Sequence, residues 1–270
     1  MPHRRRLVTD FTTCAVVPLV VLIVLGFMAR STGAETVRQG SLQVSFGGSV
    51  SPTALPRTGT TPVAVTIRGH VRALAGGPPP SLRRIAIEVN RVGVLDRAGL
   101  PTCPLGRLRA SSTTAALAAC RGALVGEGHV GGVIVLPEQV PTPFGGRVVA
   151  FNGRLPGGRP AILVHLFTGR PAPLTFVLAF ALGHAHGTFG TRLVATVPAR
   201  TRATAHITSF ALRLGRVFSV GGERRDFLSA GCPAPEGFSG ATFPLVRASY
   251  GFVGEKTVAD TLVRTCRARG

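Results

Sequence analysis

Apolar and polar residues alternate with a period of two along much of the chain after residue 40. The clearest stretches are Leu42, Val44 and Phe46, then Val63, Val65 and Ile67, then Ile85, Ile87 and Val89. This period predicts β-strands with one buried face. Further strand-like segments cover residues 129–136, 147–151, 161–167, 174–182, 192–197 and 206–218. Near the C-terminus, residues 243–253 and 257–266 flank Gly254-Glu255-Lys256, which predicts a hairpin.

One segment has the signals of a helix instead. Ser112 is a good capping residue, the run from Ala115 to Ala119 favours helix, and Gly122 can end it. Ten or eleven short strands with connections rich in glycine and proline are typical of an antiparallel architecture. We therefore expect an all-β fold, mainly an antiparallel sandwich or barrel, with one short helix.

The N-terminus has the pattern of an export signal. Arg4, Arg5 and Arg6 precede an apolar run of 16 residues from Cys14 to Ala29, and small residues at 32–34 offer a cleavage site after Ala34. The run is shorter than the roughly 20 residues that span a bilayer comfortably. We expect residues 1–34 to be a cleaved signal peptide, with an uncleaved N-terminal anchor as the alternative. Residues 35–270 would then form a β-rich domain outside the cytoplasm.

Four cysteines remain in that domain. They are Cys103, Cys120, Cys232 and Cys266, and an even number in an exported chain favours disulfides. Four cysteines allow three pairings. The local pairing, Cys103 with Cys120 and Cys232 with Cys266, closes the shortest loops and is the one we expect.

The charge is strongly positive. The chain has 31 basic and 11 acidic residues, a formal net charge of +20, and its only lysine is Lys256. Such an excess of arginine, beside much Ala, Gly, Pro and Val, is typical of GC-rich coding sequences, which raise arginine content without selection for a partner. The alternative is attraction to anionic envelope polymers. No acid lies between Val140 and Gly222, and within that stretch Arg192, Arg200 and Arg202 are the candidate anion-binding residues.

Two histidines are the best candidates for metal chemistry. His184 and His186 are two positions apart, so they point to the same side of an extended chain and can chelate Zn²⁺ or Cu²⁺. His165 is the expected third ligand, with His206 as an alternative. The competing interpretation is an exposed loop with two ordinary histidines and no cofactor.

Signatures of known catalytic classes are missing from the sequence. It has no G-x-S-x-G elbow, no P-loop and no dinucleotide-binding glycine motif. Platforms for sugars and single-stranded nucleic acids usually need Trp or Tyr, but Trp is absent and Tyr250 is the only tyrosine. Together with export, this argues against nucleic acid as a partner.

Three segments around the cysteines carry a resemblance. They are residues 99–104, 118–126 and 229–235, which read GLPTCP, AACRGALVG and SAGCPAP. These segments resemble a group of uncharacterised exported proteins from GC-rich bacteria. The resemblance implies export and two cysteine pairs, and it carries over no catalytic residue.

From the sequence we therefore expect a non-enzymatic module of the cell envelope or extracellular space, structural or binding anionic polymers. It would contact a membrane only through an uncleaved N-terminus. The alternative is a secreted hydrolase or metal-dependent enzyme that uses the loop at His184 and His186.

Overall fold

The computed structural model describes residues 34–109, 112–170, 172–255 and 257–269. Most of the strands belong to one mainly antiparallel sheet. Its order is β1 (Glu35–Gln39), β2 (Leu42–Ser51), β5 (Ala64–Ala73), β14 (Ala205–Leu214), β9 (Leu124–Ile134), β10 (Thr142–Arg154), β11 (Pro160–Thr168), β12 (Leu174–His184), β13 (Phe189–Thr196), β6 (Leu82–Asn90), β18 (Gly240–Phe252), β19 (Val258–Arg269) and β3 (Ala54–Pro56), with β8 (Cys103–Pro104) beside β10.

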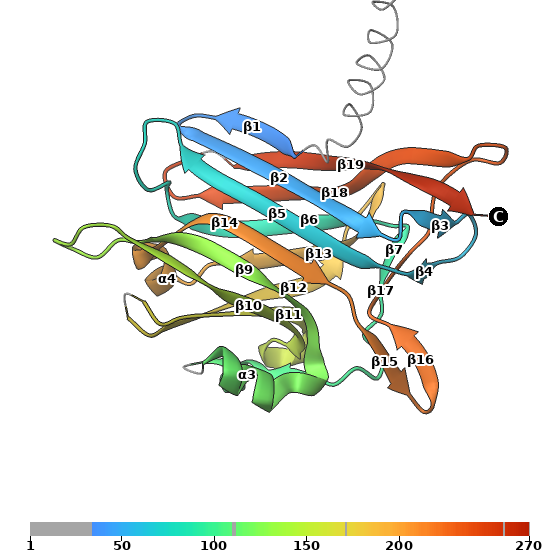
Figure 1. Cartoon of the computed structure of the whole chain (residues 1–270), viewed down its shortest axis with the longest axis horizontal. Helices are drawn as coiled ribbons and strands as arrows, with labels where there is room; N and C mark the ends of the chain where they lie inside the picture. The colour runs from blue at the N-terminus through green and yellow to red at the C-terminus, as the bar shows by residue number, and fades with distance from the viewer. Residues whose placement is uncertain (1–33, 110–111, 171, 256, 270) are drawn as a thin grey trace, which may run out of the picture. The chain divides into compact units, whose positions relative to one another are not determined.

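This sheet curls until the strand at one edge reaches the strands near the other edge. Strand β1 contacts β19, although no backbone ladder joins them. Instead, the Glu35 carboxylate accepts hydrogen bonds from the backbone N–H of Val263 at 3.5 Å and from Arg264 Nη1 at 3.2 Å. Figure 1 shows β2, β5 and β14 on the near side, with β6 and β13 behind them. The curl therefore encloses an interior.

Smaller elements surround the large sheet. Two minor sheets pair β15 (Val217–Val220) with β16 (Glu223–Asp226), and β17 (Leu228–Ala230) with both β4 (Thr61–Pro62) and β7 (Gly93–Leu95). The α-helices are α2 (Leu105–Leu108), α3 (Thr113–Cys120) and α4 (Ala199–Thr204), and 3₁₀ turns cover Arg121–Ala123 and Pro156–Gly158. Helix α3 is the helix that the sequence predicts, and the Ser112 hydroxyl caps it by accepting from the Ala115 N–H at 3.1 Å.

Glycines in β9 allow the sheet to bend tightly. A Cβ atom at Gly128 would lie 1.9 Å from the carbonyl oxygen of Ala211 on β14. At Gly132 it would lie 2.4 Å from the carbonyl oxygen of His206 and 2.5 Å from the Phe144 ring. Only glycine permits such close approach of neighbouring chains, and glycine kinks are a common source of sheet curvature.

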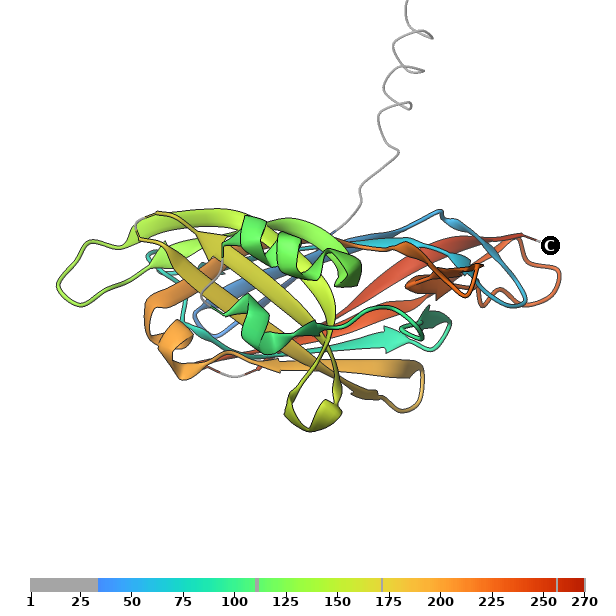
Figure 2. The ribbon, with the colours of Figure 1, turned by 90° about the horizontal axis from the view of Figure 1, so that it is seen from below.

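Strands β10 and β11 are apolar on both faces because both faces are covered. Val149, Phe151 and Leu163 pack on the outside against α2 and α3, whereas Ala150 and Ile162 pack inward. Figure 2 shows α3 lying across the outside of these strands. Strands buried on both sides have nearly continuous apolar sequences, which explains the unbroken run at residues 161–164.

Both predicted disulfides are present. Cys103 is bonded to Cys120, which fastens α3 to β8, and Cys232 is bonded to Cys266, which fastens the segment after β17 to β19. The all-β fold with one short predicted helix is confirmed, and the two bonds indicate an oxidising compartment, extracellular or in the envelope.

Several boundaries differ from the expectation. Strand β9 begins at Leu124 rather than at residue 129, and the predicted strand 206–218 is divided into β14 and β15 by Gly215. Residues 1–33 of the predicted export signal (residues 1–34) and Lys256 of the predicted hairpin turn lie outside the described residues. Within the described part of the chain, no helix combines the length and hydropathy needed to cross a membrane.

Candidate functional site

The interior of the curled sheet contains a cavity of about 180 Å³. Its lining comes from strands on all sides of the curl, and among the described residues that line it only His129, Thr201 and Tyr250 have polar side chains. The apolar lining includes Phe46, Ile67, Val164, Phe176, Leu178 and Phe210. A space of this size with apolar walls is the type of cavity that stays dry and accepts an apolar guest.

Burial along the strands agrees with an unfilled interior. Ile67, Phe176 and Leu212 line the cavity, yet each is only partly buried. In a close-packed core such side chains would touch neighbours on every side. Here one side of each borders open space, so large apolar groups keep accessible surface inside the protein.

Helix α4 lies at one end of the cavity. Thr201 in α4 and Pro198 just before it both line the cavity, as does Ala205 just after it. The Ser81 hydroxyl donates to the carbonyl oxygen of Arg202 at 2.6 Å, and this bond ties α4 to the loop before β6. We call this side the α4 end.

Tyr250 supplies a polar group near the same end. It pairs with Ile85 on β6, three residues from the start of that strand, and its ring meets Phe46 edge-on with centroids 6.1 Å apart. Tyr250 is 3% exposed, and its Oη has no hydrogen-bond partner in the structure. Burial, and then the nearby carboxyl of Asp260, raises the pKa of Tyr250, so the hydroxyl stays protonated and can donate to a ligand oxygen.

The opposite end of the interior is closed by the loop between β7 and β8. Leu100 of that loop is buried with Phe218 and Phe227. The loop is held by Asn152 of β10, which is fully buried. Asn152 Nδ2 donates to the carbonyl oxygens of Leu100 at 3.1 Å and Pro101 at 3.0 Å.

Arg97 completes this closure. Its Nε donates to Asn152 Oδ1 at 2.6 Å, and its Nη2 donates to the carbonyl oxygen of Gly153 at 3.0 Å. Burial, and then the positive charge of Arg154, lowers the pKa of Arg97. The two acceptors satisfy N–H groups of the guanidinium that water would otherwise solvate.

Replacing Asn152 by leucine should lower the free energy of unfolding by at least about 3 kcal/mol. The substitution leaves two buried carbonyl groups and one guanidinium N–H without their partner, and each such loss costs about 1–3 kcal/mol when water cannot reach the group. Urea unfolding would measure it. Asn152→Asp keeps the acceptor for Arg97 and should lose less, and equal losses in the two variants would contradict the role of Arg97.

The candidate metal ligands lie in different places. His165 is fully buried on β11 opposite Val177, whereas His184 is exposed at the end of β12 and His186 lies in the turn that follows. Seven residues separate Val177 from His184 along β12, about 23 Å of extended chain. His206 hydrogen-bonds through Nδ1 with the carbonyl oxygen of Pro79. Over the described residues, no group of three or more His, Cys, Asp or Glu side chains is placed to hold a metal.

The candidate anion-binding arginines are also separated. Arg192 lies on β13 and pairs with Glu88 at 3.6 Å, while Arg200 and Arg202 lie on α4. In the structure Arg200 and Arg202 thus lie next to the cavity, a proximity that the sequence did not predict. Binding of anionic polymers to these arginines remains a prediction.

Sequence reasoning did not find the cavity or α4. The alternation of apolar residues shows which side chains face inward, but not whether they meet. Helix α4 follows Pro198 without a side-chain cap and is six residues long, so it carries no strong helix signal. Comparison of the chain with protein-family models, with curated proteins and with solved structures gave no match.

Proposed function

We propose that this protein is an exported binding protein that holds an apolar chain in the interior of its curled sheet. One observation carries the proposal: a cavity of about 180 Å³ whose lining is apolar except for three residues. Binding sites for small molecules are commonly mostly apolar cavities with a few polar groups that fix orientation. Tyr250 and Thr201 would be such groups.

The energetic argument points the same way. Unfilled apolar space costs about 24 cal/mol per Å³ in mutational series, so an empty cavity of this size would cost about 4 kcal/mol. That is a large part of the 5–15 kcal/mol by which domains are typically stable. A guest that fills the cavity would recover part of this free energy, because its own apolar surface leaves water on binding.

The compartment supports an exported carrier or receptor. Two disulfides tie the peripheral segments to the sheet, at Cys103–Cys120 and Cys232–Cys266. Apolar chains are nearly insoluble in water, and outside the cytoplasm they need either a membrane or a protein interior. A curled sheet with an apolar cavity would provide such a protein interior.

Hexanol, whose six-carbon chain fits a cavity of about 180 Å³, should therefore bind the purified protein at one molecule per chain. Binding should lower the heat capacity, the reliable sign of apolar burial, and should raise the midpoint of thermal unfolding. At one hundred times the dissociation constant the stabilisation would be about 2.7 kcal/mol. Titration calorimetry and thermal unfolding measure both quantities.

Adsorption of the probe to the protein surface must be distinguished from binding in the cavity. It would give no fixed stoichiometry and no saturating shift in the unfolding midpoint. If hexanol neither binds stoichiometrically nor raises that midpoint, the proposed function is wrong.

A further inference from the structure

Four arginines lie on the segments at the α4 end of the cavity, and none of them is among the described residues that line it. Arg200 and Arg202 flank Thr201, which lines the cavity. Arg83 and Arg84 lie at the start of β6, where Thr196 pairs with Arg84 and the Val197 N–H donates to the carbonyl oxygen of Arg83. We call these four residues the arginine rim.

The arginine rim is not neutralised within the protein. The ion pairs found among the described residues involve none of its four members. Arg202 is half-buried, and its Nε is buried without a hydrogen-bond partner. A buried guanidinium N–H that lacks an acceptor is costly, so the rim favours an acceptor supplied from outside.

Acidic residues near this end do not reverse its charge. Glu255, in the turn after β18, accepts a hydrogen bond from the Ser41 hydroxyl at 2.6 Å. Glu138 lies in the loop after β9, whose Val135 N–H donates to the carbonyl oxygen of Thr204. The four arginines of the rim are thus opposed by three acids on this side, Glu138, Glu255 and Asp260, whose carboxyl lies near Tyr250, which leaves a formal excess of one positive charge.

The cavity has the opposite character at its other end. There Leu100, Phe218 and Phe227 close the interior with apolar side chains. Tyr250 and Thr201, two of the three polar lining residues, are both near the α4 end. The site is therefore apolar at the end closed by Leu100, Phe218 and Phe227. Towards the α4 end it has the neutral hydroxyl of Tyr250, and the guanidinium groups of the arginine rim lie on the segments at that end.

We propose that the ligand is an anionic amphiphile, with its alkyl chain in the cavity and its carboxylate or phosphate headgroup at the arginine rim. The inference rests on the proposed function, because the chain must occupy the interior for the headgroup to reach the rim. Arginine suits this role because its planar fork can donate two hydrogen bonds to a carboxylate or phosphate. The Tyr250 hydroxyl would donate to an oxygen placed just inside the rim.

Four probes of one chain length test this orientation: hexanoate, hexyl phosphate, hexanol and hexylamine, each titrated into the full chain. We expect the two anions to bind about tenfold more tightly than hexanol, and the amine to bind more weakly than hexanol. Charge-assisted hydrogen bonds of this kind give about such ratios. The preference for anions should shrink as salt rises, since exposed charges are screened. Comparing the two anions shows whether the rim prefers carboxylate or phosphate.

The variant Arg200→Gln with Arg202→Gln should remove most of the preference for anions and leave hexanol affinity unchanged. The matched control is Arg159→Gln with Arg224→Gln, which removes the same charge from exposed positions on segments away from α4 and should keep the preference. If hexanol binds but the anions bind no more tightly, the orientation is wrong and the proposed function stands. An equal loss in both double variants would show that net charge, not the rim, attracts the anion, and would also overturn the inference.

Discussion

Replacing Cys232 and Cys266 together by serine should lower the free energy of unfolding by about 4 kcal/mol. The bond closes a loop with a sequence separation of 34, and the chain-entropy model gives about this value for such a loop. The bond joins the segment after β17 to β19. Without it the unfolded chain gains freedom, and the segment loses its covalent link to the sheet. Urea unfolding with a linear extrapolation measures the loss.

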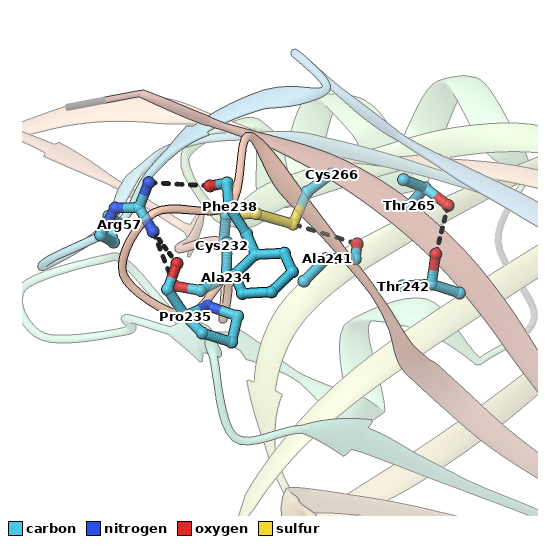
Figure 3. Close-up of a disulfide and its surroundings, with 9 residues drawn as sticks. All are labelled: Arg57, Cys232, Ala234, Pro235, Phe238, Ala241, Thr242, Thr265 and Cys266. Atoms are coloured by element: carbon cyan, nitrogen blue, oxygen red, sulfur yellow. Dashed lines mark hydrogen bonds between the residues drawn. A yellow bond between two sulfur atoms is a disulfide. The ribbon is translucent and has the colours of Figure 1, made fainter.

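Packing around this bond makes the expected loss specific. Arg57 donates to the carbonyl oxygens of Ala234 at 3.0 Å and Phe238 at 2.9 Å, and it also bonds to that of Pro235. Figure 3 shows these bonds on the segment that the disulfide holds. We expect the segment to loosen locally while the cavity, which none of these residues lines, keeps its affinity for hexanol.

The other disulfide is the matched control. Cys103 and Cys120 have a sequence separation of 17, for which the same model gives about 3 kcal/mol. The serine variant of this pair should therefore lose somewhat less. A smaller loss at Cys232 and Cys266 than at Cys103 and Cys120 would contradict the loop-entropy argument and point to strain or to structure left in the unfolded state.

Much of the fold can be predicted because strand pairing leaves a local mark in the sequence. Leu42, Val44 and Phe46 alternate as expected and are all buried, at 0%, 4% and 1% exposure. The hairpin of β18 and β19 is confirmed from its turn residues and flanking apolar runs. The cysteine pairs follow from short loop lengths, a property that is also local.

The start of β9 is missed for a physical reason. Gly126 and Gly128 resemble a loop in sequence, yet they are needed because side chains there would collide with β14. The need for glycine at these positions is set by contact between strands that are far apart in the chain, and no local sequence pattern reveals that contact. The same limit applies to His165. Its place on the strand before His184 suggests a third metal ligand, but the pairing of that strand puts His165 far from His184.

The candidate site is the least predictable part. Arg200 and Arg202 are identifiable as charges in a segment without acids, but their position beside a cavity depends on how the sheet curls. The cavity itself is a difference between available volume and side-chain volume. That difference is set by the curvature of the whole sheet, so no single segment carries it.

Replacing Val164 by phenylalanine should abolish binding of hexanol without destabilising the protein. Val164 lines the cavity, is only partly buried, and contacts apolar clusters on both sides of it. It lies on β11 between Ala150 of β10 and Leu178 of β12, so a larger side chain there has open space to enter. Filling a cavity typically adds about 0.5–2 kcal/mol of stability. Calorimetric titration and urea unfolding measure the two effects on one sample.

Val149→Phe makes the same substitution at a position where the neighbouring side chains leave no free space. Val149 is fully buried on the outer face of β10, in the cluster formed with α2 and α3. Extra volume in such a packed site should cost about 1–3 kcal/mol and leave hexanol binding intact. The two valines should thus respond in opposite directions in both measurements. Equal destabilisation by the two substitutions would mean that the interior around Val164 is as closely packed as the site around Val149, and the cavity could then hold no ligand.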